Sequence, residues 1–387
     1  MILRPKFVFV DNKWEAGQEI ELADDGSFVS LRATSQPDDG TFVSPSFVNA
    51  HSHFEYFGLA DLIPKDLEFF PWIRRLTELK TLQSPEDVTE DCHLAAAANR
   101  RTGVALVGEH SDRPGSAAAM DAHQLGGTIF QEVITFNERE RPQDKISLVE
   151  QRASEQSNVF NGNVVANPHS LYTVDEDTLR YLFSSPGQRS IHVAESIYEN
   201  QLIERAEGPF ADLERRFGFE SKARNMRAIA YLGEVGGLRP ETQIVHACDI
   251  NEAEIAMIAD SGASVAHCPR SNIRLQTPSC PVMELLAAGV SVGLGLDSAA
   301  SSGPISMFDE MRAAFQVASE RRHPLSRSQI WMMATSFGAA SLGFDHWGLH
   351  TAPLISIRSD ATSPDEMFDR AQVDSVAWIA TKPSQKL

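Results

Sequence analysis

Short apolar segments alternate along the chain with longer amphipathic stretches, and eight of these segments end in or contain an ionisable residue. Nearly continuous apolar runs of this kind are typical of parallel strands covered by helices. Eight such units between residues 45 and 344 favour an α/β fold of the TIM type, a closed (β/α)₈ barrel. The ionisable residues are His53, His110, Glu132, His169, His192, His246, His267 and Asp297.

The stretches between the apolar segments carry helix signals. Ser84-Pro85-Glu86-Asp87 combines an N-cap residue, a proline in the first turn and two acids, ahead of an alanine-rich helix that should stop at Gly103. We expect further helices at residues 251–261, 281–288 and 326–342, each followed by a glycine.

The two ends of the chain lie outside this repeat. Residues 1–44 and 345–387 contain the short apolar runs KFVFV, SFVSL, LISIR and SVAWIA. Apolar residues that alternate with polar ones predict half-buried strands. No low-complexity linker separates these ends from the rest, so we predict that they form one small β-sandwich beside a barrel of residues 45–344.

Composition narrows the class of protein. The 387 residues are 42% hydrophobic and 22% charged, as in ordinary globular proteins. The net charge of −19 disfavours a nucleic acid or a membrane surface as partner. The first apolar run is too short for a signal peptide, and no later stretch approaches the length of a membrane span. Four cysteines without a C-x-x-C pair fit a reducing cytoplasm, where we expect this protein.

The chemistry gathers at the predicted strand ends. In a (β/α)₈ barrel these ends meet on one face, where the catalytic groups lie. His51 and His53 stand two residues apart and could share a metal ion, although such a spacing also arises by chance. His192 and Asp297 complete a set of three histidines and one carboxylate, which is typical of zinc with an open position for water. Alternatively, each histidine only satisfies buried backbone groups.

The strand-end motifs resemble those of the amidohydrolase superfamily, in the same order, over about residues 40 to 340. They are His51-Ser52-His53, H-V-A-E ending at Glu195, V-H ending at His246, H-C-P-R-S-N beginning at His267, and G-L-D-S around Asp297. The most similar branch is that of triazine hydrolases and adenosine-type deaminases. Within it, N-A-H-S-H-F-E and P-H-S-L-Y-T-V are similar to aminodeoxyfutalosine deaminases and their near relatives.

This resemblance implies a hydrolase that activates water on one divalent metal ion held by His51, His53, His192 and Asp297. The residue that matches Glu195 shuttles a proton from the water to the leaving group, and the one that matches His246 orients and polarises the water. Asp297 counts as catalytic as well as a ligand. Relatives with two ions usually carry a lysine on the fourth strand, which N-V-V-A-N-P-H-S lacks, so we expect one ion, zinc before iron.

The same resemblance suggests residues that line the substrate pocket. His169 would contact the substrate, and Glu132 would lie in the pocket, although both could instead bind neighbouring strand ends. His267 lies near the pocket with an open role, and His110 and Asp112 stay unassigned.

Three further residues are candidates for substrate contact, each with a structural alternative. Trp72 lies in an aromatic segment that could stack on a flat heterocycle or pack on the barrel. Glu55 could bind ring nitrogens or pair with a nearby arginine such as Arg74. Arg270 could bind a substrate carboxylate or tie loops together.

We therefore expect a hydrolytic deaminase of a small heterocyclic substrate, an aminated purine-like nucleoside or base, with aminodeoxyfutalosine or an adenosine-type compound first. The alternatives are hydrolysis of another leaving group, as in a chlorohydrolase or a cyclic amide hydrolase, and a catalytically silent barrel that binds a ligand. The combined H-x-E and P-C-x-x-C signature of cytidine-deaminase-type zinc enzymes does not occur, because the chain has no P-C-x-x-C. The sequence does not identify the substrate, the metal or the oligomeric state. A homodimer is one possible oligomeric state.

Overall fold

A computed structural model describes residues 1–136, 141–319 and 324–379. Every one of the eight predicted strands is present where the sequence pattern placed it. They are β7 (Phe47–Ser52), β8 (Val104–Ser111), β9 (Gly126–Val133), β10 (Asn163–Pro168), β11 (Arg189–Val193), β12 (Thr242–His246), β13 (Ser264–His267) and β14 (Val292–Leu294).

These strands form two four-stranded parallel sheets, in the orders β10-β9-β8-β7 and β11-β12-β13-β14. Single parallel bridges join the sheets, one between Ser52 and Asp297 and one between Ser170 and His192. At the first bridge, Asp297 N donates to His51 O at 2.9 Å and His53 N donates to Asp297 O at 3.3 Å. The candidate metal ligands thus lie where the two sheets meet.

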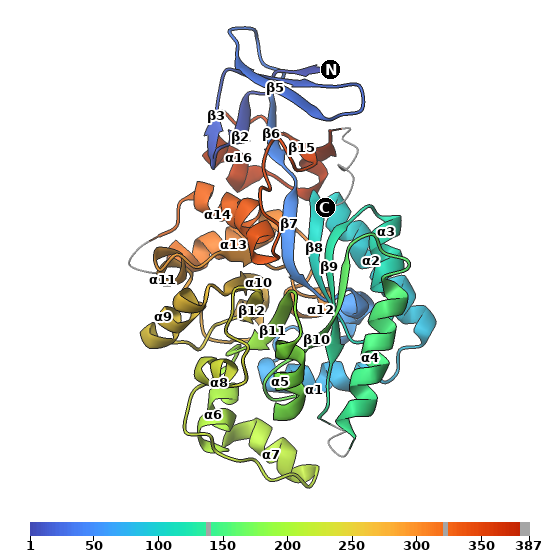
Figure 1. Cartoon of the computed structure of the whole chain (residues 1–387). Coiled ribbons are helices and arrows are strands. Elements are labelled where there is room, and N and C mark those ends of the chain that lie inside the picture. The colour runs from blue at the N-terminus through green and yellow to red at the C-terminus, as the bar shows by residue number, and fades with distance from the viewer. Residues whose placement is uncertain (137–140, 320–323, 380–387) are drawn as a thin grey trace.

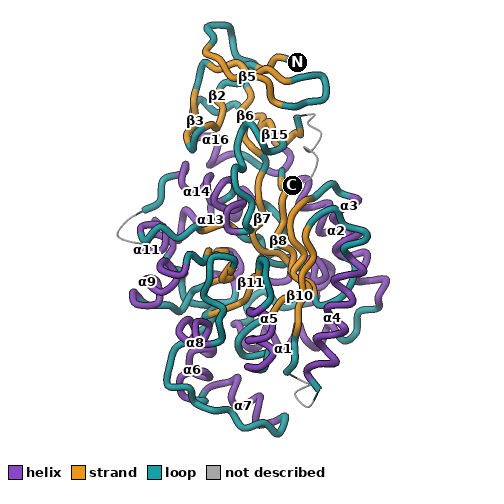
Figure 2. Tube along the Cα trace, viewed as in Figure 1, coloured by secondary structure: helices purple, strands orange, loops and turns teal. Residues whose placement is uncertain are grey.

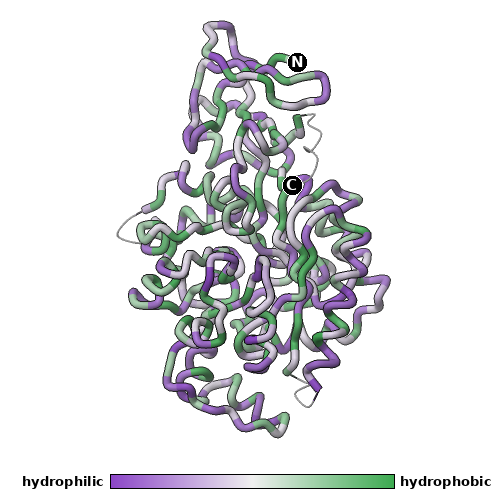
Figure 3. The backbone as a smooth tube through the Cα atoms, viewed as in Figure 1, coloured by the Kyte–Doolittle hydropathy of each residue, from purple (hydrophilic) through white to green (hydrophobic). Residues whose placement is uncertain are grey.

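Helices cover the outer faces of these sheets. In Figure 1, α2, α3 and α4 lie on the side of β8 to β10, and α9 and α11 lie on the opposite side. Figure 2 shows the strands inside this helical layer. Polar residues recur along the outer helices, whereas the strands of the β7–β10 sheet are largely apolar (Figure 3). β7 and β8 are buried at every position, which explains why their sequences are largely apolar up to the polar residues near their ends.

Three of the predicted helices are confirmed, and local capping explains two of them. In α2 (Pro85–Arg101) the Ser84 side chain accepts from Asp87 N, and the Asp87 side chain accepts from Ser84 N in return. Asn251 and Glu254 form the same reciprocal cap on α9 (Glu252–Ser261). The third is α11 (Val282–Ala287).

The predicted single helix over residues 326–342 is wrong. The chain forms α14 (Arg327–Met333) and α15 (Ser336–Ser341), separated at Thr335, where φ is −133° and ψ is −102°. The break coincides with a long-range contact, because the Ala334 carbonyl accepts from the N–H of Val48 in β7 at 2.8 Å. A hydrogen bond between residues so far apart in the sequence cannot be predicted from a local sequence pattern.

The remaining helices fill the connections between the strands. They are η1 (Phe54–Leu62), α1 (Phe69–Lys80), α3 (Ser116–Ala122), α4 (Pro142–Gln156), α5 (Glu176–Ser184), α6 (Ile197–Arg205), α7 (Gly208–Arg216), α8 (Ala228–Glu234), α10 (Pro269–Arg274), α12 (Ala299–Ser302), α13 (Met307–Ser319), α16 (Pro364–Arg370) and η2 (Val373–Ser375). Across the described ranges, no helix combines the length and the apolarity that a membrane crossing requires.

The terminal segments pair with each other at one end of the molecule, opposite α7 (Figure 1). One sheet has the order β1-β4-β5, and the other has the order β16-β15-β6-β2-β3, which joins both ends of the chain. The last eight residues of the predicted segment 345–387 lie outside the described residues. The strands are β1 (Ile2–Leu3), β2 (Phe7–Val10), β3 (Lys13–Glu15), β4 (Gln18–Leu22), β5 (Phe28–Ala33), β6 (Thr41–Pro45), β15 (Leu354–Arg358) and β16 (Val376–Trp378).

Candidate metal centre

Four side chains that the sequence marked as metal ligands meet at the ends of β7, β11 and β14. His53 Nε2 lies 3.3 Å from His192 Nε2, and His51 Nε2 lies 3.7 Å from Asp297 Oδ1. All four residues are buried. A tetrahedral zinc site with bonds of about 2.0–2.1 Å separates its ligand atoms by roughly 3.3 Å, so the spacing suits one small cation.

The hydrogen bonding of these histidines also fits a cation. Both ring nitrogens of His51 and the Nδ1 of His53 are buried and have no hydrogen-bond partner among the described residues. His192 Nδ1 lies 2.9 Å from the carbonyl oxygen of His169, to which it donates, so in the neutral ring its Nε2 presents a lone pair toward His53. Buried polar atoms without a partner are costly. A divalent cation among them would accept one lone pair from each ring.

Burial keeps these imidazoles neutral, which metal binding requires. It lowers the pKa of His51 and of His53 well below the usual value, and neighbouring histidines lower both further. Burial likewise lowers the pKa of His192 to about 4. At neutral pH the three rings therefore offer lone pairs rather than positive charge.

Three strand ends at this site adopt a strained backbone. Ala194, His246 and Asp297 have φ values of 54°, 73° and 52°, in the left-handed region that residues with a Cβ rarely adopt. Such strain persists only where the surrounding structure enforces it, and it is concentrated at functional sites. Here it turns the chain directly after β11, at the end of β12 and after β14.

Glu195 and His246 face each other beside the four candidate ligands. His246 Nε2 lies 3.5 Å from Glu195 Oε1, and both side chains are almost fully buried. Asn272 Nδ2 lies 3.2 Å from His246 Nδ1. When Asn272 donates this bond, the neutral His246 ring carries its proton on Nε2, the nitrogen that faces Glu195.

The carboxyl groups at this site are stabilised in their neutral form by burial. Burial raises the pKa of Glu195 well above its usual value, and the nearby carboxylates of Asp297 and Glu199 raise it further. Burial also raises the pKa of Asp297, although hydrogen bonds from Ser271 and Ser301 oppose this shift. A raised pKa suits a carboxyl group that gives and takes a proton near neutral pH.

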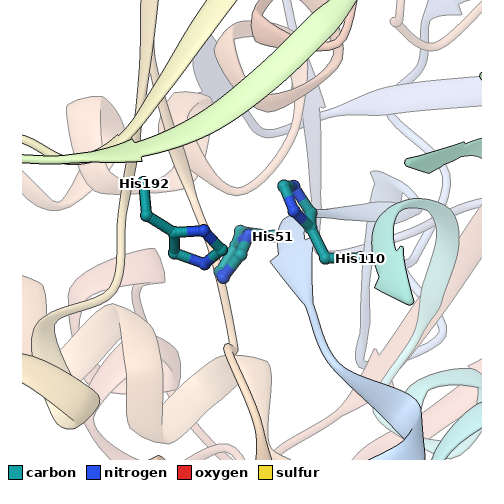
Figure 4. Close-up of side chains that lie close together, drawn as sticks. All are labelled: His51, His110 and His192. Carbon is teal, nitrogen blue, oxygen red and sulfur yellow. The ribbon is translucent and has the colours of Figure 1, made fainter. Parts of the chain in front are cut away.

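His110, which the sequence left unassigned, lies inside the cluster. Its ring packs against His51 with centroids 4.4 Å apart, and Figure 4 shows the rings of His51, His110 and His192 turned toward one another. His110 Nδ1 is 3.3 Å from Glu132 Oε1, and His110 Nε2 is 2.9 Å from the hydroxyl of Ser190. Glu132 is fully buried, so the structure places this residue among the histidines rather than on the exposed wall of a pocket.

The structure gives Glu55, Trp72 and Arg270 partners within the protein. Glu55 is fully buried and accepts from the backbone N–H groups of Asp112 and Arg113 and from Arg113 Nε. Its arginine partner is thus Arg113 and not the exposed Arg74. Trp72 Nε1 donates to Ala300 O at 3.1 Å, and Arg270 Nη1 donates to Pro304 O at 2.7 Å. A substrate would have to displace these bonds.

His169 lies beside His192, and His267 lies near His246. The half-buried His169 holds His192 through its carbonyl oxygen, and its ring lies 4.8 Å from the His192 ring. Its Nδ1 contacts the hydroxyl of Thr173 at 2.8 Å. His267 is 1% exposed, and its proximity lowers the pKa of His246 further. His169 is therefore the more accessible of the two.

Sequence reasoning did not find the residues that support these groups. Asn272 fixes the His246 ring, and Ser271 and Ser301 lower the pKa of Asp297. The S-N pair that closes the H-C-P-R-S-N motif is the signal for Ser271 and Asn272, whereas Ser301 has none in that motif.

Removing the Glu55 carboxylate is expected to destabilise the fold. Glu55→Ala leaves two backbone N–H groups and Arg113 without their acceptor, which should cost about 3 kcal/mol of unfolding free energy. Urea denaturation measures this loss. Glu68→Ala, an exposed glutamate in the same connection, serves as the control and should change stability by less than about 0.5 kcal/mol. Equal effects of the two substitutions would contradict the prediction.

The sequence of this chain is similar to those of known proteins. Residues 42–352 match the profile of the Amidohydrolase family. Among curated proteins, the chain is 29% identical over 333 residues to a 5-methylthioadenosine/S-adenosylhomocysteine deaminase of Haloarcula marismortui, which covers 82% of this chain and 73% of that protein.

Solved structures share the fold. An adenosine deaminase from Xanthomonas campestris with bound zinc has a TM-score of 0.78 at 22% identity and covers 100% of this chain and 93% of its own. Helicobacter pylori aminofutalosine deaminase in complex with methylthio-coformycin has a TM-score of 0.77 at 18% identity and covers 97% of this chain and 99% of its own. Atrazine chlorohydrolase from Arthrobacter aurescens, complexed with zinc, has a TM-score of 0.77 at 15% identity and covers 98% of this chain and 96% of its own.

Proposed function

Because this chain belongs to the amidohydrolase family, we propose that it is a metal-dependent deaminase that removes an amino group from an adenosine-type nucleoside or base by hydrolysis. Family membership confirms the resemblance that the strand-end motifs predicted. The deaminase relative of Haloarcula marismortui and the adenosine and aminofutalosine deaminases of the same fold support this reaction.

One observation carries the proposal. A buried pair, Glu195 and His246 at 3.5 Å, lies beside a cluster in which donor atoms of His51, His53 and Asp297 lie within 4.8 Å of one another. His192 Nε2 lies 3.3 Å from His53 Nε2 in the same cluster. Hydrolytic deamination needs a nucleophilic water, a group that moves a proton from it to the leaving nitrogen, and a donor that stabilises the developing charge. The arrangement offers a residue for each task.

His51, His53, His192 and Asp297 would hold the metal ion, zinc before iron. When bound, such an ion lowers the pKa of a coordinated water and so makes it nucleophilic near neutral pH.

The protein's own groups would move the proton. Glu195 takes a proton from the attacking water and returns it to the amino nitrogen, so that a C–O bond forms, the C–N bond breaks and ammonia leaves. His246 donates from Nε2 to the attacking oxygen, which holds the oxygen toward the reacting carbon. Asn272 keeps the His246 proton on that nitrogen. His169 and Glu132 are the residues that we propose for substrate contact or its support.

A substrate panel tests the function. Purified, zinc-loaded protein should release ammonia from aminodeoxyfutalosine or from an adenosine-type nucleoside such as 5-methylthioadenosine or S-adenosylhomocysteine, at least about 100-fold faster than from the free base. An ammonia assay with a parallel chloride assay on chlorotriazines measures this. Chloride release without ammonia release would establish the halide as leaving group and overturn the proposal.

Several finer points belong to the same proposal. We infer that the eight parallel strands close into a barrel through the two bridges, and that the two terminal sheets pack as a sandwich. A cytoplasmic location and a homodimer also stay predictions.

A further inference from the structure

Hydrogen bonds hold both the carbonyl oxygen and the N–H of Ala194, the residue directly before Glu195. The carbonyl oxygen of Ala194 accepts from the backbone N–H groups of Cys248 and Asp249, at 2.9 and 2.8 Å, in the loop that follows β12. The N–H of Ala194 donates to the carboxylate of Glu199. Since Ala194 has a strained φ of 54°, these bonds keep it in a conformation that it would otherwise leave.

Glu199 is the third residue of α6 and is 1% exposed. A glutamate at this helical position ordinarily accepts from the N–H of the N-cap residue, here Ser196. That cap is not formed at Ser196. The carboxylate instead accepts from Ala194 N–H and is also stabilised by the N–H of Glu195 itself.

We propose that Glu199 is a positioning residue that fixes the backbone at Ala194, directly before Glu195, so that the Glu195 carboxylate faces His246. The inference rests on the proposed function, because it assumes that Glu195 moves the proton. Glu199 touches neither His246 nor the candidate metal ligands in any hydrogen bond of the described residues, so it would act only through Glu195.

The next residue of α6 holds the opposite strand end. Asn200 Nδ2 donates to Asp249 O at 2.9 Å and to Asp249 Oδ2 at 2.7 Å, in the loop just after His246. Asn200 Oδ1 accepts from the N–H of Ala228 at 2.8 Å. The first turn of α6 therefore secures the chain next to both members of the proton-transfer pair.

Three substitutions of Glu199 separate positioning from simple stabilisation. Glu199→Ala should lower kcat by about 10- to 100-fold, the usual cost of misplacing a reacting group by about 1 Å, with KM changed by less than about threefold. Glu199→Gln keeps an acceptor oxygen and should retain kcat within about fivefold, whereas Glu199→Asp keeps the charge but not the reach and should lose kcat. Zinc content should stay at the wild-type value in all three.

Glu254→Ala is the matched control. Glu254 is also the third residue of its helix, α9, is 3% exposed, and accepts from Asn251 N at 2.9 Å. Its removal deletes a buried cap without touching Glu195, so kcat should stay within about threefold. If Glu199→Ala lowers kcat no more than Glu254→Ala does, Glu199 is only structural and the inference is overturned.

A double-mutant cycle with Glu195→Gln completes the test. Once the positioned carboxyl group is gone, adding Glu199→Ala should lower the residual rate by less than about twofold. A further full loss would show that Glu199 acts elsewhere and would overturn the inference. Undiminished deamination by Glu195→Gln alone would instead overturn the proposed role of Glu195, and the inference with it.

Discussion

Glu195→Gln is expected to lower kcat for deamination by about a thousandfold, because proton transfer by a positioned side chain contributes about 10²- to 10⁴-fold. The amide keeps the size of the carboxyl group and can still accept from His246, but it cannot carry a proton from water to the leaving nitrogen. KM should change little. Steady-state ammonia release measures both constants.

The control for this variant is Glu252→Gln, an exposed glutamate in the first turn of α9. It should deaminate at the wild-type rate. The zinc content of Glu195→Gln should also be unchanged, which separates a lost proton path from a lost ion. A fall of less than about tenfold in kcat would mean that another group moves the proton.

His192→Ala is expected to abolish activity by removing the metal ion. Substituting a residue that only supports a metal ligand typically lowers metal affinity or activity by about 10- to 100-fold. Removing the ligand itself should therefore lower zinc affinity by more than about 100-fold. Added zinc should restore activity to chelator-treated wild type but not to this variant. Competition with a chromophoric chelator measures the affinity.

His93→Ala tests whether the effect is specific. His93 lies on α2 with its ring 5.7 Å from that of His123, and it is not among the clustered residues. It should bind zinc with wild-type affinity and deaminate normally. Equal zinc affinity in His192→Ala and His93→Ala would exclude His192 as a ligand.

Local signals explain what the sequence could predict. Apolar runs marked the eight strands because all of them except β10 are buried along most of their length. Ser84 and Asn251 marked two helix starts because each caps its helix within three residues. The convergence of His51, His192 and Asp297 followed from one topological rule, that parallel strand ends share a face.

Contacts between distant segments explain what the sequence could not predict. The break at Thr335 depends on Val48, and Glu55 pairs with Arg113 because η1 packs beside the end of β8, whereas Arg74 points to solvent on α1. Glu199 resembles an ordinary helix cap in the sequence. Only the turn at Ala194 brings its carboxylate to the backbone N–H of Ala194, directly before Glu195.

Side chains from three separate strand ends should hold one divalent cation. Anomalous diffraction at the zinc edge, from crystals of zinc-loaded protein, would locate this ion. We expect one peak, about 2.0–2.2 Å from a nitrogen of each of His51, His53 and His192 and from an oxygen of Asp297. A peak bound elsewhere, or none within reach of these four residues in protein that deaminates, would contradict this expectation.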